Sequence, residues 1–155
     1  WNHTNITWYF YNSFNVDDII EKAFALYSKH SSLTFKKDFQ CPTMYITVTP
    51  TVHIKYSERK TCPYDFDGPG GVLGHAFVPY PGMNQTDIHL DFNENWDFTM
   101  NLPAYDKSSF FLTMAHEIGH ALGLQHSYVA TSVMFPVSFT PKGIRDLNEF
   151  DLDRD

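Results

Sequence analysis

The hydrophobic residues of the chain recur with two spacings, which separate helical segments from strands. In 16–28 and 108–122 they recur every three or four residues, the spacing that places them on one side of a helix. Asn15 precedes the first segment and can cap that helix, and Gly123 follows the second, where a left-handed residue can end it. The run 6–11 is rich in aromatic and β-branched residues and predicts a strand.

Between the two predicted helices the pattern changes to that of short strands. In 52–56 apolar residues alternate with His53 and Lys55, which predicts a half-buried strand with its apolar side chains toward the core. Two more strands are expected around His75 and His89, on either side of a segment rich in turn residues. We expect His3, His30 and His53 to be solvent-exposed rather than functional.

Composition and charge narrow the class of protein. The chain has 155 residues, of which 43% are hydrophobic and 19% charged, so we expect one globular domain rather than a disordered segment. Its net charge of −7 indicates no basic surface for nucleic acid or anionic membranes, and no apolar run is long enough to span a membrane. Glycosylation sequons at Asn2, Asn5 and Asn84, together with two cysteines, predict a secreted glycoprotein.

One motif indicates a catalytic metal. The segment HEIGHALGLQH begins at His116. His116 and His120 lie four residues apart, so a helix projects both side chains from one face toward a single ion. Gly123 lets the chain turn back, so that His126 can supply a third ligand. Three imidazoles that leave one position open are typical of catalytic zinc, and Glu117 lies close enough to act on a water in that position.

This motif, with Met134 eight residues after its last histidine, resembles that of the metzincin zinc peptidases. Ser127 after the third histidine and Pro136 two residues beyond the methionine resemble one metzincin family, the matrixins or matrix metalloproteinases. Two further segments look like matrixin segments: DFDGPGGVLGHAF and IHLDFNENW. The resemblance covers nearly the whole chain and matches a single catalytic domain, which we place at 1–155.

The resemblance implies an α/β fold of metzincin type. We expect a twisted, five-stranded, mostly parallel sheet with three helices, the last of which begins near Asn148. A zinc cleft would separate a larger N-terminal subdomain, about 1–122, from a small C-terminal one, about 123–155. Met134 is expected to be structural, as a hydrophobic floor beneath the zinc-binding histidines.

The same resemblance implies a secreted, extracellular, zinc-dependent endopeptidase that hydrolyses extended protein substrates. A zinc-activated water would attack the peptide bond, with Glu117 as general base. Expected partners are protein or peptide substrates, matrixin-type protein inhibitors and hydroxamates, and the domain is expected to be a monomer. Two alternatives remain: a zinc-holding binding module without activity, against which the retained Glu117 argues, and another metzincin family.

The resemblance also implies which residues contact substrate. Leu73 and Gly74 would lie on the strand that forms the upper rim of the cleft and pairs with an extended substrate. Leu112, one turn before the first zinc ligand, would help to set the depth of the main specificity pocket, which we expect to be apolar and medium to deep. The outer wall of this pocket would begin with three residues: Pro136, Val137 and Ser138.

A second cation is expected at the turn DGPGG. This segment can wrap carbonyl oxygens around a hard cation such as calcium, although the segment alone favours a plain tight turn. The resemblance favours calcium. It implies a site made of three carboxylates and three backbone carbonyls: Asp67, Asp91 and Glu94, with Gly68, Gly70 and Val72.

The two cysteines leave three interpretations open. The structural zinc of the family uses a His-x-Asp pair and two further histidines; His75 and His89 match the latter, but Lys60 and Cys62 stand in place of the pair. We prefer a disulfide between Cys41 and Cys62 that replaces the metal, because the expected compartment is oxidising. Alternatively, both cysteines and both histidines form a closed zinc site, or both thiols are inert and buried.

Overall fold

The computed structural model describes residues 1–136. The strands in chain order are β1 (Asn5–Phe10), β2 (Thr34–Lys37), β3 (Met44–Thr49), β4 (Ile54–Lys55), β5 (Lys60–Thr61), β6 (Gly74–Ala76), β7 (Thr86–Asp91), β8 (Trp96–Asp97) and β9 (Ser108–Ser109). The helices are α1 (Asp17–Ser28) and α2 (Phe110–Leu122). The third helix expected near Asn148, and part of the expected C-terminal subdomain, lie outside the described residues.

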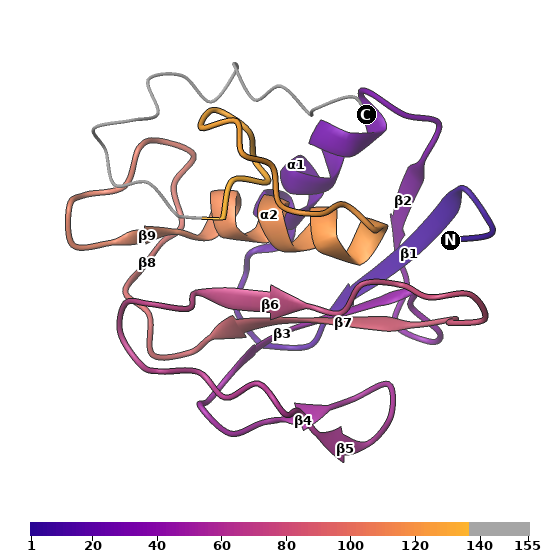
Figure 1. The fold of residues 1–155 in the computed structure, drawn as a ribbon, viewed down its shortest axis with the longest axis horizontal. Coiled ribbons are helices and arrows are strands. Elements are labelled where there is room, and N and C mark those ends of the chain that lie inside the picture. The colour runs from indigo at the N-terminus through magenta and orange to yellow at the C-terminus, as the bar shows by residue number, and fades with distance from the viewer. Residues whose placement is uncertain (137–155) are drawn as a thin grey trace.

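Five strands form one sheet in the order β2–β1–β3–β7–β6. The first four are parallel to their neighbours, whereas β6 runs antiparallel to β7 at one edge. The expected five-stranded, mostly parallel sheet is thereby confirmed. The other strands of the described residues form two short pairs, β4–β5 and β8–β9. Figure 1 shows both helices on one side of the sheet and the β4–β5 hairpin on the other.

The core lies between the sheet and the two helices. Burial alternates along β1, where Ile6, Trp8 and Phe10 are buried, as the period of two in a strand requires. Trp8 stacks on Phe24 of α1 with ring centroids 5.5 Å apart. Four members of the apolar stripe predicted for the second helix are buried in the same core: Phe111, Met114, Ala115 and Ile118.

Both helices end where the sequence indicates, but only α2 has a side-chain cap at its start. The Ser109 hydroxyl accepts a hydrogen bond from the Leu112 N–H (3.2 Å). Gly123 ends α2 with a φ of 107°, a conformation that costs glycine little. α1 begins after Val16 without a side-chain cap, so the predicted cap by Asn15 is wrong. Two acidic residues in its first turn still complement the helix dipole.

Segment 52–56 is oriented opposite to the prediction. Its apolar side chains are exposed: Val52 to 62%, Ile54 to 55% and Tyr56 to 40%. His53 is only 5% exposed, so its predicted place at the surface is wrong. Because side chains alternate across a strand, the burial of one polar position turns its apolar neighbours outward. Apolar burial therefore does not hold this segment on the sheet.

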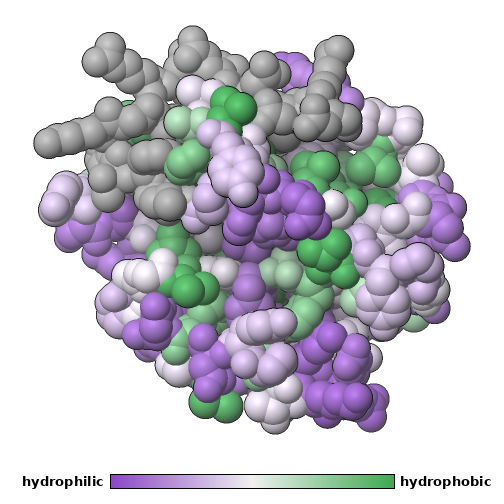
Figure 2. Space-filling view, in the orientation of Figure 1, coloured by the Kyte–Doolittle hydropathy of each residue, from purple (hydrophilic) through white to green (hydrophobic). Residues whose placement is uncertain are grey.

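Within residues 1–136, neither α1 nor α2 is long and apolar enough to cross a membrane. Figure 2 shows one face of the molecule, on which hydrophobic side chains are interspersed with hydrophilic ones. In the coloured part of that view the hydrophobic side chains form small separate areas. Scattered apolar residues of this kind are normal on a folded protein.

Gly119 allows α2 to pack closely against two other segments. A Cβ atom at this position would lie 2.2 Å from Sδ of Met134 and 2.7 Å from Oη of Tyr27. The Tyr27 hydroxyl also donates to the Ala115 carbonyl (2.6 Å), which joins α1 to α2. The two helices and the segment at Met134 therefore meet at a point where only a hydrogen atom fits.

We expect Gly119→Ala to destabilise the fold by about 1–3 kcal/mol, the usual cost of an extra methyl group in a packed core. Alanine is the better helix former by about 1 kcal/mol, so a loss of stability would come from the packing contact. Urea unfolding of the metal-loaded protein measures the change.

The matched control is the same substitution in a Met134→Ala background. The shorter side chain at 134 opens space for the added methyl group, so Gly119→Ala should cost less there than in the wild type. An equal cost in both backgrounds would contradict the packing contact.

Candidate functional site

A cleft of about 890 Å³ runs between α2 and β6. Four of the residues expected to contact substrate line it: Leu73, Gly74, Leu112 and Pro136. The other two, Val137 and Ser138, lie outside the described residues. The cleft is also lined by His116, Glu117, His120 and His126, so the structure brings the expected substrate contacts and the expected metal ligands together.

Three histidine side chains converge in this cleft. Nε2 of His120 lies 3.1 Å from Nε2 of His116 and 3.1 Å from Nε2 of His126, and the latter two atoms are 3.3 Å apart. α2 places the first two one turn apart, and the left-handed Gly123 lets the chain return with the third. Nitrogen ligands about 2.1 Å from a tetrahedral zinc lie about 3.4 Å from each other. The triangle of nitrogens is therefore close to the size that zinc requires.

Hydrogen bonds on the far ring nitrogens fix which nitrogen is protonated in two of these histidines, His116 and His120. Nδ1 of His116 lies 2.8 Å from the Val133 carbonyl, and Nδ1 of His120 lies 2.9 Å from the Leu124 carbonyl. A carbonyl only accepts, so each Nδ1 carries the proton and each neutral ring turns a lone pair on Nε2 toward the other. Burial lowers the pKa of His116 to about 4 and also lowers the pKa of His120, which favours the neutral rings. A cation between the facing lone pairs would resolve their repulsion, and carbonyls on the far nitrogens are typical of metal-binding histidines.

Glu117 lies beside this triangle. Its side chain is 5% exposed, and its Oε2 has no hydrogen-bond partner among the described residues. Burial raises the pKa of Glu117 to about 8; a cation held by the histidines would oppose this shift, because it favours the carboxylate. Gly74 faces Glu117 from β6, since a Cβ at 74 would lie 3.2 Å from Cγ of Glu117. A buried carboxyl group beside an open metal position is suited to proton transfer.

Met134 belongs to the turn that supports the triangle. It is 4% exposed and packs on Gly119, and its carbonyl accepts a hydrogen bond from the Ser127 N–H (3.0 Å). Val133, the residue before it, provides the carbonyl that orients His116. These contacts suit the structural role that we expected for Met134.

The turn after Asp67 folds back on the other acidic residues that were expected to bind calcium. The Gly70 N–H donates to Oε1 of Glu94 (2.6 Å), and the Val72 N–H donates to Oδ1 of Asp67 (3.1 Å). Burial raises the pKa of Glu94, and the charges of Asp91 and Asp67 add to that shift. None of the ion pairs within residues 1–136 involves these three carboxylates. The turn thus gathers negative charge without a lysine or arginine partner in that part of the chain.

Asp91 is the strongest sign of a cation at this turn. Its side chain is fully buried, and its Oδ1 accepts hydrogen bonds from the backbone (2.8 Å) and the side chain (3.2 Å) of Asn93. Its Oδ2 has no partner in the part of the chain that the structure describes. A buried carboxylate oxygen without a partner is costly, and a hard cation with oxygen ligands would satisfy it.

A second group of potential metal-binding side chains involves residues that flank the β4–β5 hairpin, which Figure 1 shows on the side of the sheet opposite the helices. Potential ligand atoms of His53, Cys62, His75 and His89 all lie within 4.8 Å of one another. His75 and His89 are opposite each other on β6 and β7. His53 comes directly before β4 and Cys62 directly after β5.

This arrangement corrects our interpretation of the cysteines. Cys41 and Cys62 are both free, the first exposed and the second buried, so the structure does not contain the disulfide that we preferred. His53 takes the place that we gave to Cys41 in the alternative zinc set. The reason is the pairing of the hairpin: the Cys62 N–H donates to the His53 carbonyl (2.8 Å), which brings these two residues together. Cys41 lies beside β1, where its carbonyl accepts from the Thr7 hydroxyl (3.4 Å).

His53 is the candidate ligand that sequence reasoning missed. The hydrophobic alternation of 52–56 predicted the opposite orientation. One signal in the sequence could have identified His53. Lys60 cannot replace the histidine ligand of the family, so a four-ligand zinc site that includes Cys62 needs another histidine near Cys62 in the chain. The side chain of Lys60 is indeed 76% exposed.

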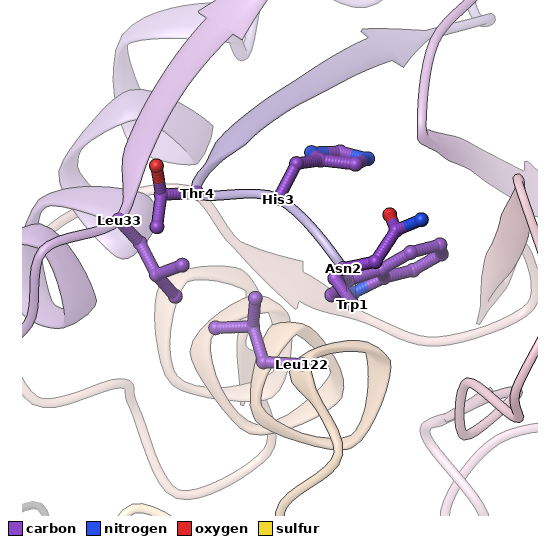
Figure 3. Close-up of a pocket in the computed structure, with 6 residues that line it drawn as sticks. All are labelled: Trp1, Asn2, His3, Thr4, Leu33 and Leu122. Atoms are coloured by element: carbon purple, nitrogen blue, oxygen red, sulfur yellow. The ribbon is translucent and has the colours of Figure 1, made fainter.

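A second pocket of about 320 Å³ lies near the first residues of the chain (Figure 3). Its lining residues are Trp1, Asn2, His3, Thr4, Leu33 and Leu122. The Trp1 indole N–H donates to the Ala121 carbonyl (2.9 Å) and holds this segment on the end of α2. The lining contributes a single histidine and neither a carboxylate nor a thiol side chain, so the cleft remains the candidate active site.

Comparison with known proteins identifies the family of the chain. A sequence model of the family described as Matrixin matches residues 1–155. The chain is 45% identical to matrix metalloproteinase-27 of Tupaia belangeri over 82% of its own length and 23% of that protein. It is 37% identical to interstitial collagenase of Sus scrofa over 99% of its own length and 31% of that protein. It is 33% identical to matrix metalloproteinase-2 of Drosophila melanogaster over 88% of its own length and 18% of that protein.

The chain therefore spans between 18 and 31% of the length of these relatives. The family match covers both segments that form the cleft, α2 with its histidine triangle and the edge strand β6. The chain belongs to the matrixin family.

Proposed function

We propose that this domain is a zinc-dependent endopeptidase that cleaves extended protein or peptide substrates. The observation that carries the proposal is the triangle of His116, His120 and His126 beside the buried Glu117 in an open cleft. A structural zinc site is closed by four protein ligands, whereas this triangle offers three and leaves one position toward the cleft. A binding module without activity is the weaker proposal, because it has no use for a buried carboxyl group at that position.

In the proposed hydrolysis of a peptide bond, different residues of the cleft have different roles. His116, His120 and His126 would hold the zinc, which would supply a Lewis acid and lower the pKa of a water in the open position to about 7. Glu117 accepts the proton of that water as general base and then donates it to the departing amine. The carbonyls of Val133 and Leu124 hold two of the imidazoles in the orientation that the metal needs.

The edge of the sheet supports substrate binding in an extended conformation. β6 is the last strand of its sheet, and the carbonyl of Leu73 accepts from the Asp91 N–H on the β7 side (2.9 Å). Backbone groups alternate in direction along an antiparallel strand, so those of Gly74 and Ala76 face away from β7. Both residues line the cleft. An extended peptide can therefore add to this edge through main-chain hydrogen bonds.

The specificity pocket and the second cation complete the proposal. Leu112 lines the cleft one turn before His116, which supports an apolar pocket for the residue after the scissile bond. Calcium would stabilise the turn next to β6, because it satisfies Oδ2 of Asp91 and offsets the charges of Asp67 and Glu94.

The environment that suits this proposal is extracellular. The sequon residues Asn2, Asn5 and Asn84 are all exposed, so each is accessible to glycosylation. The names of the relatives support protein substrates, and we extend to this domain the expected inhibition by matrixin-type protein inhibitors and hydroxamates, acting on a monomer.

Glu117→Gln should lower kcat/KM by about 10²–10⁴-fold, the usual contribution of a general acid–base group. The amide keeps the shape of the side chain and removes no metal ligand, so the zinc content should not change. Peptide cleavage and metal analysis on the same sample measure both effects. Glu21→Gln, at an exposed position of α1, is the matched control, and equal rates for wild type and Glu117→Gln would defeat the peptidase proposal.

Peptides with leucine after the scissile bond should be cleaved faster than otherwise identical peptides with arginine. The reason is that burying an unpaired guanidinium beside Leu112 is costly. Relative kcat/KM values from competition between the two peptides test this expectation. A preference for arginine would contradict an apolar pocket.

Calcium should raise the unfolding temperature of the zinc-loaded domain, and a concentration of 100 times Kd corresponds to about 2.7 kcal/mol. Asp91→Asn should remove most of this gain, because it deletes the buried charge without a change of shape. Asp106→Asn makes the same charge change at an exposed position and should keep the gain. A calcium effect of unchanged size in Asp91→Asn would contradict the site.

A further inference from the structure

We propose that His53, Cys62, His75 and His89 form a closed, four-ligand zinc site that fastens the β4–β5 hairpin to the edge of the sheet. Two ligands come from the hairpin and two from β6 and β7. The ligand set differs from that of the family. Lys60 stands where the family has a histidine ligand, and His53 takes over that role. Cys62 stands where the family has an aspartate ligand, so a sulfur takes the place of a carboxylate.

Backbone carbonyls determine which ring nitrogen of His53 carries the proton, as they do for His116 and His120 in the cleft. Its Nδ1 lies 3.0 Å from the Pro50 carbonyl and 3.1 Å from the Thr51 carbonyl. Because carbonyls only accept, Nδ1 carries the proton, and the neutral ring offers the lone pair of Nε2 to the cluster. That atom lies 3.3 Å from Nε2 of His75. His53 thus has both the backbone support and the free donor atom of a metal ligand.

Hydrogen bonds alone do not account for the contacts of His75. Its Nε2 lies 3.3 Å from Nε2 of His53 and 3.0 Å from Nδ1 of His89. The same atom lies 3.3 Å from Sγ of Cys62. One ring nitrogen carries at most one proton, so it can donate to only one of these three neighbours. A zinc ion about 2.1 Å from the nitrogens and about 2.3 Å from the sulfur would engage all four atoms.

Among the described residues, the other contacts of the hairpin with the rest of the molecule are individually weak ones, such as the ring contact of Tyr56 with Tyr11 (centroids 5.2 Å apart). β4 and β5 have two residues each, and an isolated short hairpin is not stable. Its apolar side chains face solvent, whereas His53 and Cys62 are 5% and 1% exposed. A protein that buries a histidine and a thiol in place of available apolar side chains gains stability only if those groups find a partner.

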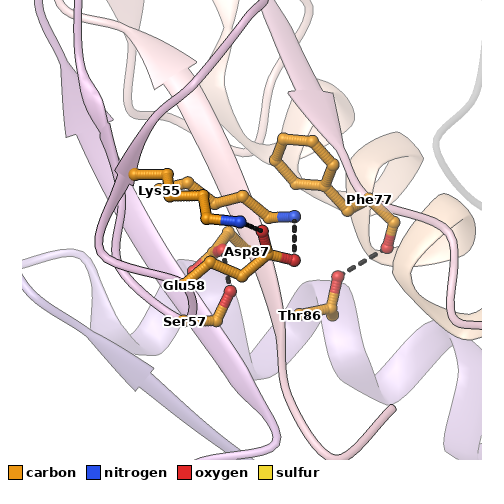
Figure 4. Close-up of polar contacts among 7 residues, drawn as sticks. Lys55, Ser57, Glu58, Phe77, Thr86 and Asp87 are labelled. Carbon is orange, nitrogen blue, oxygen red and sulfur yellow. Dashed lines mark hydrogen bonds and ion pairs between the residues drawn. The ribbon is translucent and has the colours of Figure 1, made fainter. Parts of the chain in front are cut away.

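Figure 4 shows the polar contacts that join the hairpin region to the sheet. The Ser57 hydroxyl donates to Oδ2 of Asp87 (2.6 Å), and the Lys55 ammonium lies 4.2 Å from the centroid of the Phe77 ring. Lys55 also pairs with Glu58 within the hairpin region itself (2.9 Å). One hydroxyl hydrogen bond and one cation–π contact are individually weak links, so a metal bound to both sides would be the dominant link.

The donor set selects zinc. A thiolate and three imidazoles are ligands that zinc prefers, whereas calcium and magnesium take oxygen ligands. The four ligands are buried or half-buried, and four protein ligands leave no position for water. The site is therefore structural rather than catalytic.

The position of His75 connects this site to the cleft. Its neighbours Gly74 and Ala76 present their backbone to the cleft, while its side chain points to the cluster on the other side of the sheet. Loss of the second zinc should therefore loosen the edge that binds substrate and raise KM more than it lowers kcat. This consequence alone rests on the proposed peptidase function.

Metal analysis of the full chain after dialysis tests the site by its zinc content. Wild type should hold two zinc ions per chain, whereas His53→Ala and Cys62→Ser should each hold one. His30→Ala and Cys41→Ser are matched controls at exposed positions and should keep two. The zinc count does not depend on cleavage, so its failure is distinct from a failure of the peptidase proposal.

Cobalt in place of zinc identifies the sulfur ligand. A cobalt-bound thiolate gives a charge-transfer absorption in the near ultraviolet that imidazole and carboxylate ligands lack. We expect this band in wild type and in Cys41→Ser. Cys62→Asp retains an anionic ligand, so it should fold and keep both metal ions but lose the band.

Three results would overturn the proposal. The first is a zinc content that is the same in wild type, His53→Ala and Cys62→Ser. The second is a cobalt band that survives in Cys62→Asp. The third is an intact mass lower by the two hydrogens of a Cys41–Cys62 disulfide in the metal-loaded protein.

Discussion

Backbone carbonyls hold the far nitrogen of three histidines in this structure, and each of these bonds turns a lone pair toward other metal-binding atoms. Val133 and Leu124 do this for two histidines in the cleft, and Pro50 does it for His53. Lone pairs that face each other at about 3 Å share no proton, so the arrangement is stable only around a cation. The packing of α2 and the turn after it brings such lone pairs together in the cleft, and the packing of the β4–β5 hairpin does so in the second group of metal-binding side chains. The proposed cations would resolve this conflict in both clusters.

The alternation of side chains along β6 and β7 places the two metal groups on opposite faces of one sheet edge. Gly74 pairs with Leu90 and faces Glu117 in the cleft, whereas His75 pairs with His89 and faces the hairpin. A strand of three residues thus separates the proposed catalytic centre from the proposed structural one. Because a shift of register by one residue exchanges the two faces, an error in the pairing of β6 would disrupt both centres.

The features that depend on local spacing could be predicted from the sequence. His116 and His120 share a helix face, and Gly123 ends that helix, whatever the rest of the fold does. The sheet class followed from the family resemblance. The place of His53 could not be predicted, because the alternation around it favours exposed polar and buried apolar side chains. Tertiary context reversed that preference: Cys62, nine residues later, pairs with His53 across the hairpin, and their partners come from β6 and β7. The pairing partner of Cys62 was likewise misjudged, because sequence separation does not reveal which strands are neighbours.

Buried polar atoms without partners gather around the same centres. In the part of the chain that the structure describes there are five such atoms, and four belong to Asp87, His89, Asp91 and Glu117. Oδ2 of Asp91 is the atom offered to the proposed calcium, and Glu117 lies beside the histidine triangle. The unpartnered atom of His89 is Nε2, whereas its Nδ1 faces the cluster, and Asp87 lies two residues before His89 on β7. Burial of a carboxylate without a partner is costly, and a chain with a net charge of −7 has few cationic side chains to spare. Bound cations are a more economical solution than lysine or arginine here, because a single ion can engage several buried groups at once. The open triangle leaves one position for chemistry, whereas the closed site uses every position for attachment. β6 borders the cleft on one side and supplies His75 to the closed site on the other, so the proposed zinc would give rigid support to the edge that is proposed to bind substrate.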